Sequence, residues 1–342
     1  MIKIITLYNS YNVGAFLQAY SLYTVLKKKK LSVEFLDVGQ NPDEYFCRQM
    51  KYIRNPFEIF FQLKQRNKYR KAVRDYFKVS DKCSNVEDDY IIVGSDEMWN
   101  VKNGSFSHLP EYFGKNLKCK KMISYAVSGN GVSSIDVKTF NSEFDLDSFD
   151  AISVRDIYTL NLARDLSEQQ VKKVCDPTIL LNDFDVNARK RLDYDYVLVY
   201  AYQSNLSDSE KKSIMDYAKR NGLKTVSVSL YNPWCDVNIT ATPLEFLGYL
   251  KNAKSVVTST FHGTVLSIIL NKQFYTYAHT NEKICEILAD LFLEQRIVDK
   301  IDFYEELPDI KYTEVNEKLL LLQQDSSAWL DEQLKVEVQE NG

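Results

Sequence analysis

The sequence of 342 residues lacks several features that would assign it to a familiar class of protein. No apolar run approaches the roughly 18 residues of a membrane-spanning helix, and the start, MIKIITLYNSYN, lacks the apolar core and cleavage site of a secretion signal. No long basic run offsets the net charge of −4, so bulk attraction to nucleic acid is not expected. We therefore expect a soluble, cytoplasmic protein with no nucleic-acid partner and at most peripheral membrane contact.

Patterns that bind metals are also missing from the sequence. The six cysteines are scattered singly, with no C-x-x-C pair and no histidine at ligand spacing. They are Cys47, Cys83, Cys119, Cys175, Cys235 and Cys285. We interpret them as reduced, mostly structural thiols, and we predict no metal site.

What the sequence does contain is an alternation of short β-rich apolar runs with longer amphipathic stretches, which is typical of βαβ units on a parallel sheet. In the first half, strands are expected near residues 3–8, 33–38, 90–94, 122–127 and 151–154, with a helix over 15–30. In the second half, strands near 196–202, 225–230, 255–259 and 274–278 alternate with helices near 207–221, 243–252, 263–270 and 282–292.

The length favours two domains, and the fold class is therefore α/β with two Rossmann-type, doubly wound domains. We place the first at residues 1–185 and the second at 186–310. Residues 55–80, rich in Phe, Tyr, Lys and Arg, predict a helical insertion or lid, and residues 311–342 predict a helical tail that reaches back over the first domain. Two such sheets should face a cleft between their strand ends, where ligands usually bind.

The strongest candidate for chemistry is the segment VTSTFHGT, residues 257–264, where a strand ends and a helix begins. A helix start favours an anion. Thr260 is expected to cap the helix, Gly263 to let a ligand approach the backbone, and His262 to offer a proton or a hydrogen bond. The alternative is a buried histidine that only stabilises the turn. Because the chain has only three histidines and His262 follows a strand, we favour function.

Two cationic residues are further candidates. Arg155, in ISVRD, lies at the carboxyl end of a predicted strand, where its guanidinium can bind a carboxylate or phosphate through two hydrogen bonds. An ion pair with Asp156 or another carboxylate is equally compatible with the spacing. Lys283 lies early in a predicted helix, where a cation is unfavourable unless it serves an anion. A solvated lysine is the simpler alternative at that position.

Two segments of the first half suit a sugar or a phosphate. In NSYNVGA, Asn12 can cap a helix and Gly14 can open its first turn to a ligand, although the full G-x-G-x-x-G pattern is missing and ordinary capping is favoured. In GSDEMWN, the Trp99 ring can stack on a sugar while Asp96 and Glu97 bind its hydroxyls. Asp96 can also accept a proton from an attacking hydroxyl. The same segment can instead simply cap the next helix.

Taken in sequence order, five motifs resemble those of the polysaccharide pyruvyl transferase family, over about residues 2–299. They are N-x-G-A in the first helix, G-S-D-E-x-W-N, I-S-V-R-D, D-P-T, and T-S-T-F-H-G followed by N-K-Q-F. The resemblance implies a GT-B-like fold and a transferase that moves the enolpyruvyl unit of phosphoenolpyruvate onto sugar hydroxyls. The product would be a pyruvate ketal, formed during surface polysaccharide biosynthesis.

The resemblance also implies roles for individual residues. Arg155, His262 and Lys283 are the positions that it implies for the donor site, and our own hypothesis is that His262 is the general acid or orients the phosphate. Asp96 or Glu97 would bind the acceptor, or take its proton, on the first domain. Phosphoenolpyruvate would be a co-substrate with no other cofactor, and the acceptor a lipid-linked or nucleotide-linked sugar.

The sequence departs from the family pattern near His262. Many relatives carry arginine where Thr260 stands, and glycine and proline where Asn271 and Gln273 stand. Two alternative functions therefore stay open. One is a glycosyltransferase of the same architecture that uses a nucleotide sugar, and the other is a non-catalytic carbohydrate-binding relative.

Overall fold

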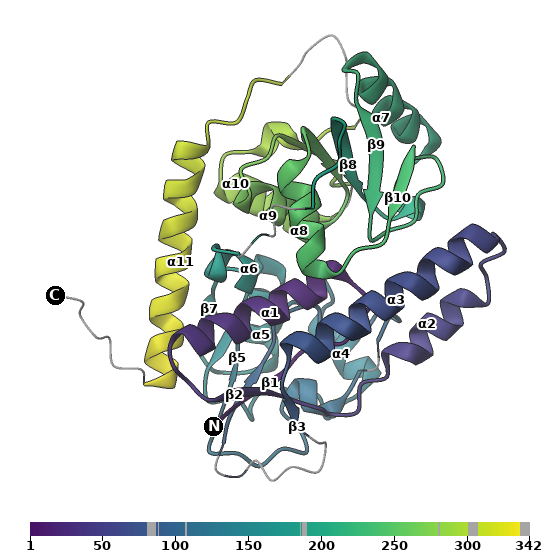
Figure 1. Ribbon diagram of the computed structural model, residues 1–342. Coiled ribbons are helices and arrows are strands. Elements are labelled where there is room, and N and C mark those ends of the chain that lie inside the picture. The colour runs from purple at the N-terminus through teal and green to yellow at the C-terminus, as the bar shows by residue number, and fades with distance from the viewer. Residues whose placement is uncertain are drawn as a thin grey trace. The chain divides into compact units, whose positions relative to one another are not determined.

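The computed structural model describes residues 1–80, 87, 89–106, 108–184, 186, 190–279, 281–299 and 307–335 (Figure 1). The chain divides into two compact units, and we describe each by itself. Unit 1 comprises Met1–Lys51, Val73–Leu181 and Leu320–Gly342, and unit 2 comprises Tyr52–Ala72 and Asn182–Leu319. The boundary predicted after residue 185 falls near the division at Leu181, but residue 185 itself, like Cys83 and residues 336–342 of the predicted tail, lies outside the described residues.

Unit 1 is built on a parallel sheet with strand order β3-β2-β1-β4-β5. These strands are β1 (Ile2–Ile5), β2 (Val33–Leu36), β3 (Val79–Ser80), β4 (Tyr90–Val93) and β5 (Lys121–Ser124). Bridges between the Ile123 and Ala151 backbones, and between Val127 and Val154, lead on to the pair β6 (Ile152–Val154) and β7 (Val171–Lys173). This is the strand order of a dinucleotide-binding sheet, and the order reverses between β1 and β4.

Helices flank the unit 1 strands. They are α1 (Val13–Lys28), α2 (Pro42–Met50), α4 (Ser134–Phe140), α5 (Ile157–Leu166) and α6 (Pro177–Leu181), with a 3-10 turn at Pro110–Phe113. The predicted first helix is confirmed, and its lysine-rich stretch is a helix end, because Lys27 and Lys28 lie in the last turn. Figure 1 shows α1 beside α6. Fully buried side chains of α1, such as Phe16 and Leu22, stabilise the unit by about 1.5–3 kcal/mol each.

Unit 2 repeats the same topology with strand order β10-β9-β8-β11-β12, all parallel. The strands are β8 (Tyr196–Tyr200), β9 (Lys224–Val228), β10 (Val237–Ile239), β11 (Ser255–Thr258) and β12 (Phe274–Thr276). Every residue of β8 is buried, as expected for a strand covered by helices on both faces. The order reverses between β8 and β11, and Tyr200 pairs with Thr258, so these two strands end at the same edge.

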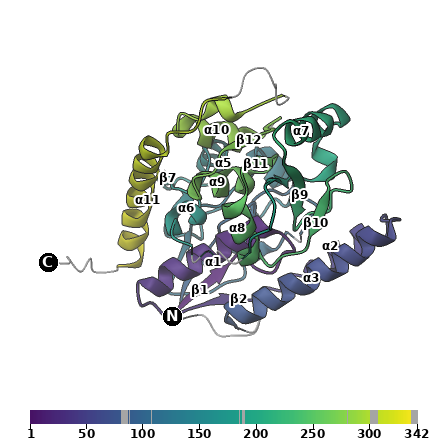
Figure 2. The same ribbon diagram turned by 45° about the horizontal axis from the view of Figure 1, so that its top comes forward.

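In the described part of the chain, four α-helices accompany the strands of unit 2, and three of them begin at a side-chain cap. They are α7 (Asp208–Arg220), α8 (Pro243–Asn252), α9 (Phe261–Ile269) and α10 (Glu282–Asp290), with 3-10 turns at Gln203–Asn205 and Glu294–Arg296. Ser207 and Thr242 form capping boxes with Glu210 and Glu245, and Thr260 caps α9 as predicted. Figure 2 shows α9 next to β11 and β12.

The predicted helical insertion is confirmed as α3 (Pro56–Tyr76), whose first seventeen residues are counted with unit 2. Its buried stripe consists of Phe61, Gln65, Tyr69 and Ala72. The Gln65 amide donates to the Ala241 carbonyl at 2.7 Å and accepts from the Ala241 N–H at 3.0 Å. The insertion therefore packs on the second half of the chain, although we expected it with the first.

The predicted tail helix is confirmed as α11 (Tyr312–Leu334). Its residues from Leu320 onward belong to unit 1, as expected. There the Ser326 hydroxyl accepts the Cys175 N–H at 2.8 Å, and Asp331 pairs with Lys29 at 2.7 Å. Among the helices that the structure describes, none combines the length and the apolar character that crossing a membrane requires.

Candidate functional site

The turn from β11 to α9 places a helix start at the strand-order reversal of unit 2. The Thr258 hydroxyl donates to the Tyr200 carbonyl at 2.7 Å, which ties the end of β11 to the end of β8. The Thr260 hydroxyl accepts the Gly263 N–H at 3.0 Å. Because the first turn of α9 contains no acidic residue, the positive end of the helix dipole at this edge is not offset from within the helix.

Gly263 has a packing role that we did not predict. A Cβ atom at this position would overlap the Thr258 hydroxyl and lie 2.7 Å from the Thr260 hydroxyl oxygen. Its N–H already bonds to Thr260. Glycine is therefore required so that α9 can approach β11 closely, and its role in letting a ligand approach the backbone stays a prediction.

The side chains of His262 and Lys283 both lie near the Phe261 ring. The ring centroids of Phe261 and His262 are 5.3 Å apart and nearly perpendicular, and the Lys283 ammonium lies 5.9 Å from the Phe261 centroid. Lys283 is only 5% exposed, which rules out the alternative of a solvated lysine. The lysine lies in the first turn of α10, close to the start of α9, so a cation is present at this edge of the sheet.

A second histidine, which the sequence analysis did not single out, lies at the same sheet edge. His279 follows β12 in the left-handed backbone region, and its Nε2 is 2.8 Å from the Glu210 carboxylate in the first turn of α7. Burial raises the pKa of Glu210, but hydrogen bonds from the Ser207 backbone and from His279 outweigh burial and lower it. The sequence could have indicated His279 as a candidate site residue, because it comes directly after the strand predicted at 274–278.

Ser259, the residue directly after β11, is a further polar group at this edge that the sequence analysis missed. Its hydroxyl is buried, and within the ranges that the structure describes it has no hydrogen-bond partner. Buried polar groups are nearly always hydrogen-bonded, so the exception is informative. We therefore include Ser259 in the candidate site of unit 2.

At the strand-order reversal of unit 1, three fully buried side chains form a closed ring of hydrogen bonds. Thr6 donates to the Ser95 carbonyl at 2.9 Å, the Ser95 hydroxyl donates to the Gln18 amide oxygen at 2.9 Å, and the Gln18 amide donates to the Thr6 hydroxyl at 3.0 Å. The ring joins the end of β1 to α1 and to the loop after β4. Nothing in the sequence motifs indicated Thr6 or Gln18.

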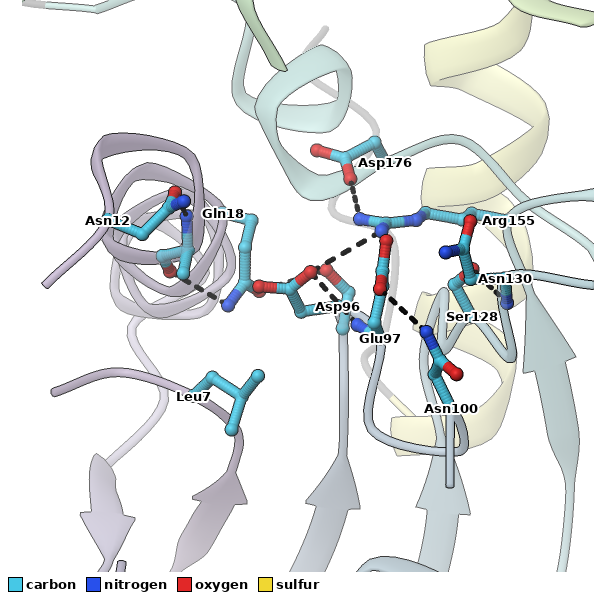
Figure 3. A network of polar contacts seen from close by, with 12 residues as sticks. Leu7, Asn12, Gln18, Asp96, Glu97, Asn100, Ser128, Asn130, Arg155 and Asp176 are labelled. Atoms are coloured by element: carbon cyan, nitrogen blue, oxygen red, sulfur yellow. Dashed lines mark hydrogen bonds and ion pairs between the residues drawn. The ribbon is translucent and has the colours of Figure 1, made fainter. Parts of the chain in front are cut away.

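Arg155 is buried beside this ring and bonds to two carboxylates (Figure 3). One terminal nitrogen lies 2.8 Å from Asp176 and the other 3.4 Å from Asp96. Burial lowers the pKa of the guanidinium, but Asp176 and Asp96 raise it above its ordinary value. The structure thus shows the ion-pair alternative for Arg155, with Asp176 and Asp96 as partners, while Asp156 caps α5 by accepting the Thr159 N–H at 2.8 Å.

In the GSDEMWN segment, Glu97 is half-buried and the other residues are buried. Glu97 accepts hydrogen bonds from the Asn100 and Asn103 amides at 2.9 and 3.2 Å. Asp96 adopts a left-handed backbone at φ 82°, which for a residue other than glycine is concentrated at functional sites. Trp99 is fully buried and donates to the Tyr112 carbonyl at 2.8 Å. Since no face of its ring is exposed, the prediction that Trp99 stacks on a sugar is wrong.

The remaining predicted residues, Asn12 and Gly14, lie at the start of α1. The Asn12 side chain accepts the Ala15 N–H at 3.0 Å, which is the capping role we favoured. Gly14 is buried in the first turn. Neither contact points to a ligand.

The two reversal points suit different chemistry. The edge of unit 2 combines a helix start, a buried lysine and a half-buried histidine, which together favour an anion with carboxylate or phosphate groups. The edge of unit 1 presents carboxylates and amides, which favour a ligand rich in hydroxyls.

Comparisons with known proteins agree with the topology. The family model described as polysaccharide pyruvyl transferase matches residues 12–281. The crystal structure of UDP-GlcNAc 2-epimerase from Neisseria meningitidis bound to UDP-GlcNAc is similar, with 9% identity, a TM-score of 0.50, and coverage of 97% of this chain and 98% of that one. A putative UDP-N-acetylglucosamine 2-epimerase from Listeria monocytogenes has 9% identity and a TM-score of 0.48, covering 94% and 87%.

No curated protein sequence matches the chain. At 9% identity the likeness to the Neisseria structure shows the fold alone, which is α/β and GT-B-like with two parallel sheets.

Proposed function

The chain belongs to the polysaccharide pyruvyl transferase family, and on that premise we propose that it transfers the enolpyruvyl unit of phosphoenolpyruvate onto two hydroxyls of a sugar. The product is a pyruvate ketal destined for a surface polysaccharide. In this proposal phosphoenolpyruvate is a co-substrate that needs no further cofactor, and the acceptor is a lipid-linked or nucleotide-linked sugar.

The arrangement of His262 and Lys283 around the Phe261 ring carries the proposal. Phosphoenolpyruvate presents a carboxylate and a phosphate on one small skeleton, so its site needs a cation and oriented N–H donors. Lys283 supplies a buried cation beside Phe261, and the start of α9 adds the positive end of a helix dipole. His262 supplies a group that can hold or release a proton at neutral pH.

The proposed reaction begins with a proton from His262 to the methylene carbon of phosphoenolpyruvate, which becomes a methyl group. The adjoining carbon becomes electrophilic, and the first sugar hydroxyl bonds to it while giving its proton to a carboxylate. The bond from that carbon to the phosphate oxygen then breaks, and phosphate leaves with the electron pair. The second hydroxyl adds to the same carbon and loses its proton, which completes the ketal and balances the reaction.

In unit 1, Asp96 and Glu97 are the proposed acceptor residues. Both lie in the loop after β4, where carboxylate oxygens can accept hydrogen bonds from sugar hydroxyls and take the released proton. Arg155 bonds to Asp96 and Asp176, so we propose that it positions the Asp96 carboxylate, in place of the donor contact that the family resemblance implies.

The proposal is tested by incubating the full chain with phosphoenolpyruvate and glycolipids that carry galactose or N-acetylmannosamine. Mass spectrometry should find acceptor with one added pyruvate ketal, and one phosphate should be released for each ketal formed. His262→Ala should lower the rate of transfer by about 10²- to 10⁴-fold, because a general acid contributes about that much. Its thermal unfolding midpoint should change little, because the His262 side chain is only half-buried.

The matched control is His108→Gln, which removes a histidine that packs between Phe106 and Phe140 in unit 1 and should leave the rate unchanged. Full transfer by His262→Ala, with unchanged donor affinity, would overturn the role of His262. Thermal stabilisation by a nucleoside diphosphate but not by phosphoenolpyruvate would favour a glycosyltransferase. Glycan binding without phosphate release would favour a non-catalytic relative.

A further inference from the structure

The outward face of α3 and the residues just before it expose an unusual group of large apolar side chains. Tyr52, Phe57, Phe60 and Leu63 are 83, 77, 69 and 43% exposed. Single exposed apolar residues are normal on a protein surface, but aromatic rings gathered within twelve residues mark an interaction site. None of these side chains belongs to the candidate sites described above.

The same segment carries a strong positive charge. Residues 52–72 contain six basic residues against one acidic residue, Glu58, so their net charge is +5, while the whole chain is −4. The basic residues are Arg54, Lys64, Arg66, Lys68, Arg70 and Lys71. A basic segment in an otherwise acidic protein indicates an anionic partner.

The opposite face of α3 is held to unit 2, so the exposed face has a defined direction. Phe61 packs against Tyr231 with ring centroids 5.4 Å apart, and Lys68 pairs with Glu245 at 2.7 Å. Burial raises the pKa of Glu245, but hydrogen bonds from Lys68, the Thr242 backbone and Lys190 lower it to about 2, so the pair stays charged at neutral pH.

Helical spacing sorts the remaining side chains onto the outer stripe. The exposed side of α3 carries Phe60, Leu63, Lys64 and Lys71, which helical spacing places within about 100° of one another, away from the buried stripe. Apolar rings thus lie toward the start of α3 and lysines toward its end. Helices that lie in a membrane interface combine these two features, because rings enter the headgroup region and lysines attract anionic lipids.

We propose that the α3 face, formed by Tyr52, Phe57, Phe60, Leu63, Lys64 and Lys71, docks the protein on an anionic lipid surface. Charge complementarity favours a bilayer of anionic lipid, and the exposed aromatic rings favour it over a purely polar polyanion. Docking does not depend on the proposed transfer reaction, because it can be measured without donor or acceptor. It would bring the protein to the surface where lipid-linked sugars lie.

The test is flotation of the full chain with vesicles of phosphatidylcholine alone or with added phosphatidylglycerol. Wild type should bind the anionic vesicles and be released by high salt. The double variant Phe57→Ser/Phe60→Ser should bind them at least tenfold more weakly, because two rings no longer enter the interface. Lys64→Gln/Lys71→Gln should weaken binding by roughly 30-fold, since each lysine near an anionic surface contributes on the order of a fivefold preference.

Matched controls keep folding and surface chemistry separate from docking. Ile135→Ser removes a 75% exposed apolar side chain of unit 1, and Lys212→Gln/Lys219→Gln removes two exposed lysines of α7, and both should bind like wild type. Thermal midpoints of all variants should agree. The proposal is overturned if wild type does not bind anionic vesicles, or if the control variants weaken binding as much as the α3 variants do. It is also overturned if Phe57→Ser/Phe60→Ser changes only the oligomeric state, from dimer to monomer.

Discussion

The two parallel sheets share one strand order but differ in what lies at the point where that order reverses. In unit 1, Thr6, Gln18 and Ser95 bond to one another, and Arg155 bonds to two carboxylates. In unit 2, the same topological point holds the start of α9, with His262 and a buried lysine nearby.

The reversal point of unit 1 is a network of buried polar groups that bond to one another, whereas that of unit 2 combines a helix start with a histidine and a buried lysine. The polar groups at the unit 1 reversal form hydrogen bonds and ion pairs with one another. Removing one of them leaves its partner buried without a hydrogen bond, which lowers the stability of the fold. At the unit 2 reversal, the buried Lys283 ammonium lies beside the Phe261 ring, close to the start of α9. Substitution of Arg155 should therefore cost stability in unit 1, whereas substitution of Lys283 should weaken donor binding in unit 2.

The largest expected effect is that of Arg155→Met. Removal of the guanidinium leaves Asp176 and Asp96 as buried, uncompensated carboxylates, which should lower the free energy of unfolding by about 3–5 kcal/mol. Urea denaturation followed by circular dichroism measures the loss. Arg164→Met, on the exposed surface of α5, is the matched control and should stay within about 0.5 kcal/mol of wild type. Equal stability of the two variants would remove the contrast between the reversal points.

The next effect tests the opposite side of the comparison. Lys283→Met should raise the phosphoenolpyruvate concentration needed for half-maximal rate roughly 10- to 100-fold, because a charged hydrogen bond to the donor is lost. Its thermal midpoint, measured beside that of wild type, separates a loss of donor binding from a loss of folding. A lower midpoint with normal donor affinity would show that Lys283 is structural.

The smallest effect concerns the pair of Glu210 and His279. The pKa of Glu210 is lower in the folded protein than in the unfolded chain, where it is near 4.3. The ionised carboxylate therefore stabilises the fold at a pH above the unfolded pKa. This contribution is lost as the pH falls through the pKa of the folded protein. Glu210→Gln should be less stable than wild type by on the order of 1 kcal/mol at pH 7. Thermal melts from pH 7 to 3 should show the gap closing below about pH 4. A gap that is constant with pH would contradict the charge-based account.

Much of the architecture could be predicted from local patterns. The strands predicted in both halves and the helices that begin at Asn12 and Thr260 are present, because hydrophobic period and capping chemistry act over a few neighbouring residues. The three strands that were not predicted, β3, β7 and β10, have two or three residues each. A run of that length is too short to show a period.

Burial could not be predicted from the motifs themselves. Trp99 looked like a sugar-stacking residue because an indole is both apolar and polar, yet its ring is buried and its N–H bonds to a backbone carbonyl. Lys283 looked solvated, yet it is buried beside Phe261. Which face of a helix or loop meets the core depends on elements far away in the chain.

By itself, the sequence determined the alternating βαβ pattern, the helix start after β11 and the motifs of the family, because all of these are written in short stretches of chain. Only the tertiary structure decided that Arg155 pairs with Asp96 and Asp176, and that Lys283 lies beside the Phe261 ring next to His262 in the chain. Asp96 and Asp176 lie 59 and 21 residues from Arg155 in the chain, and His262 and Lys283 are 21 residues apart. Their meeting depends on strand order, which brings the carboxyl ends of separate strands to one edge of a sheet.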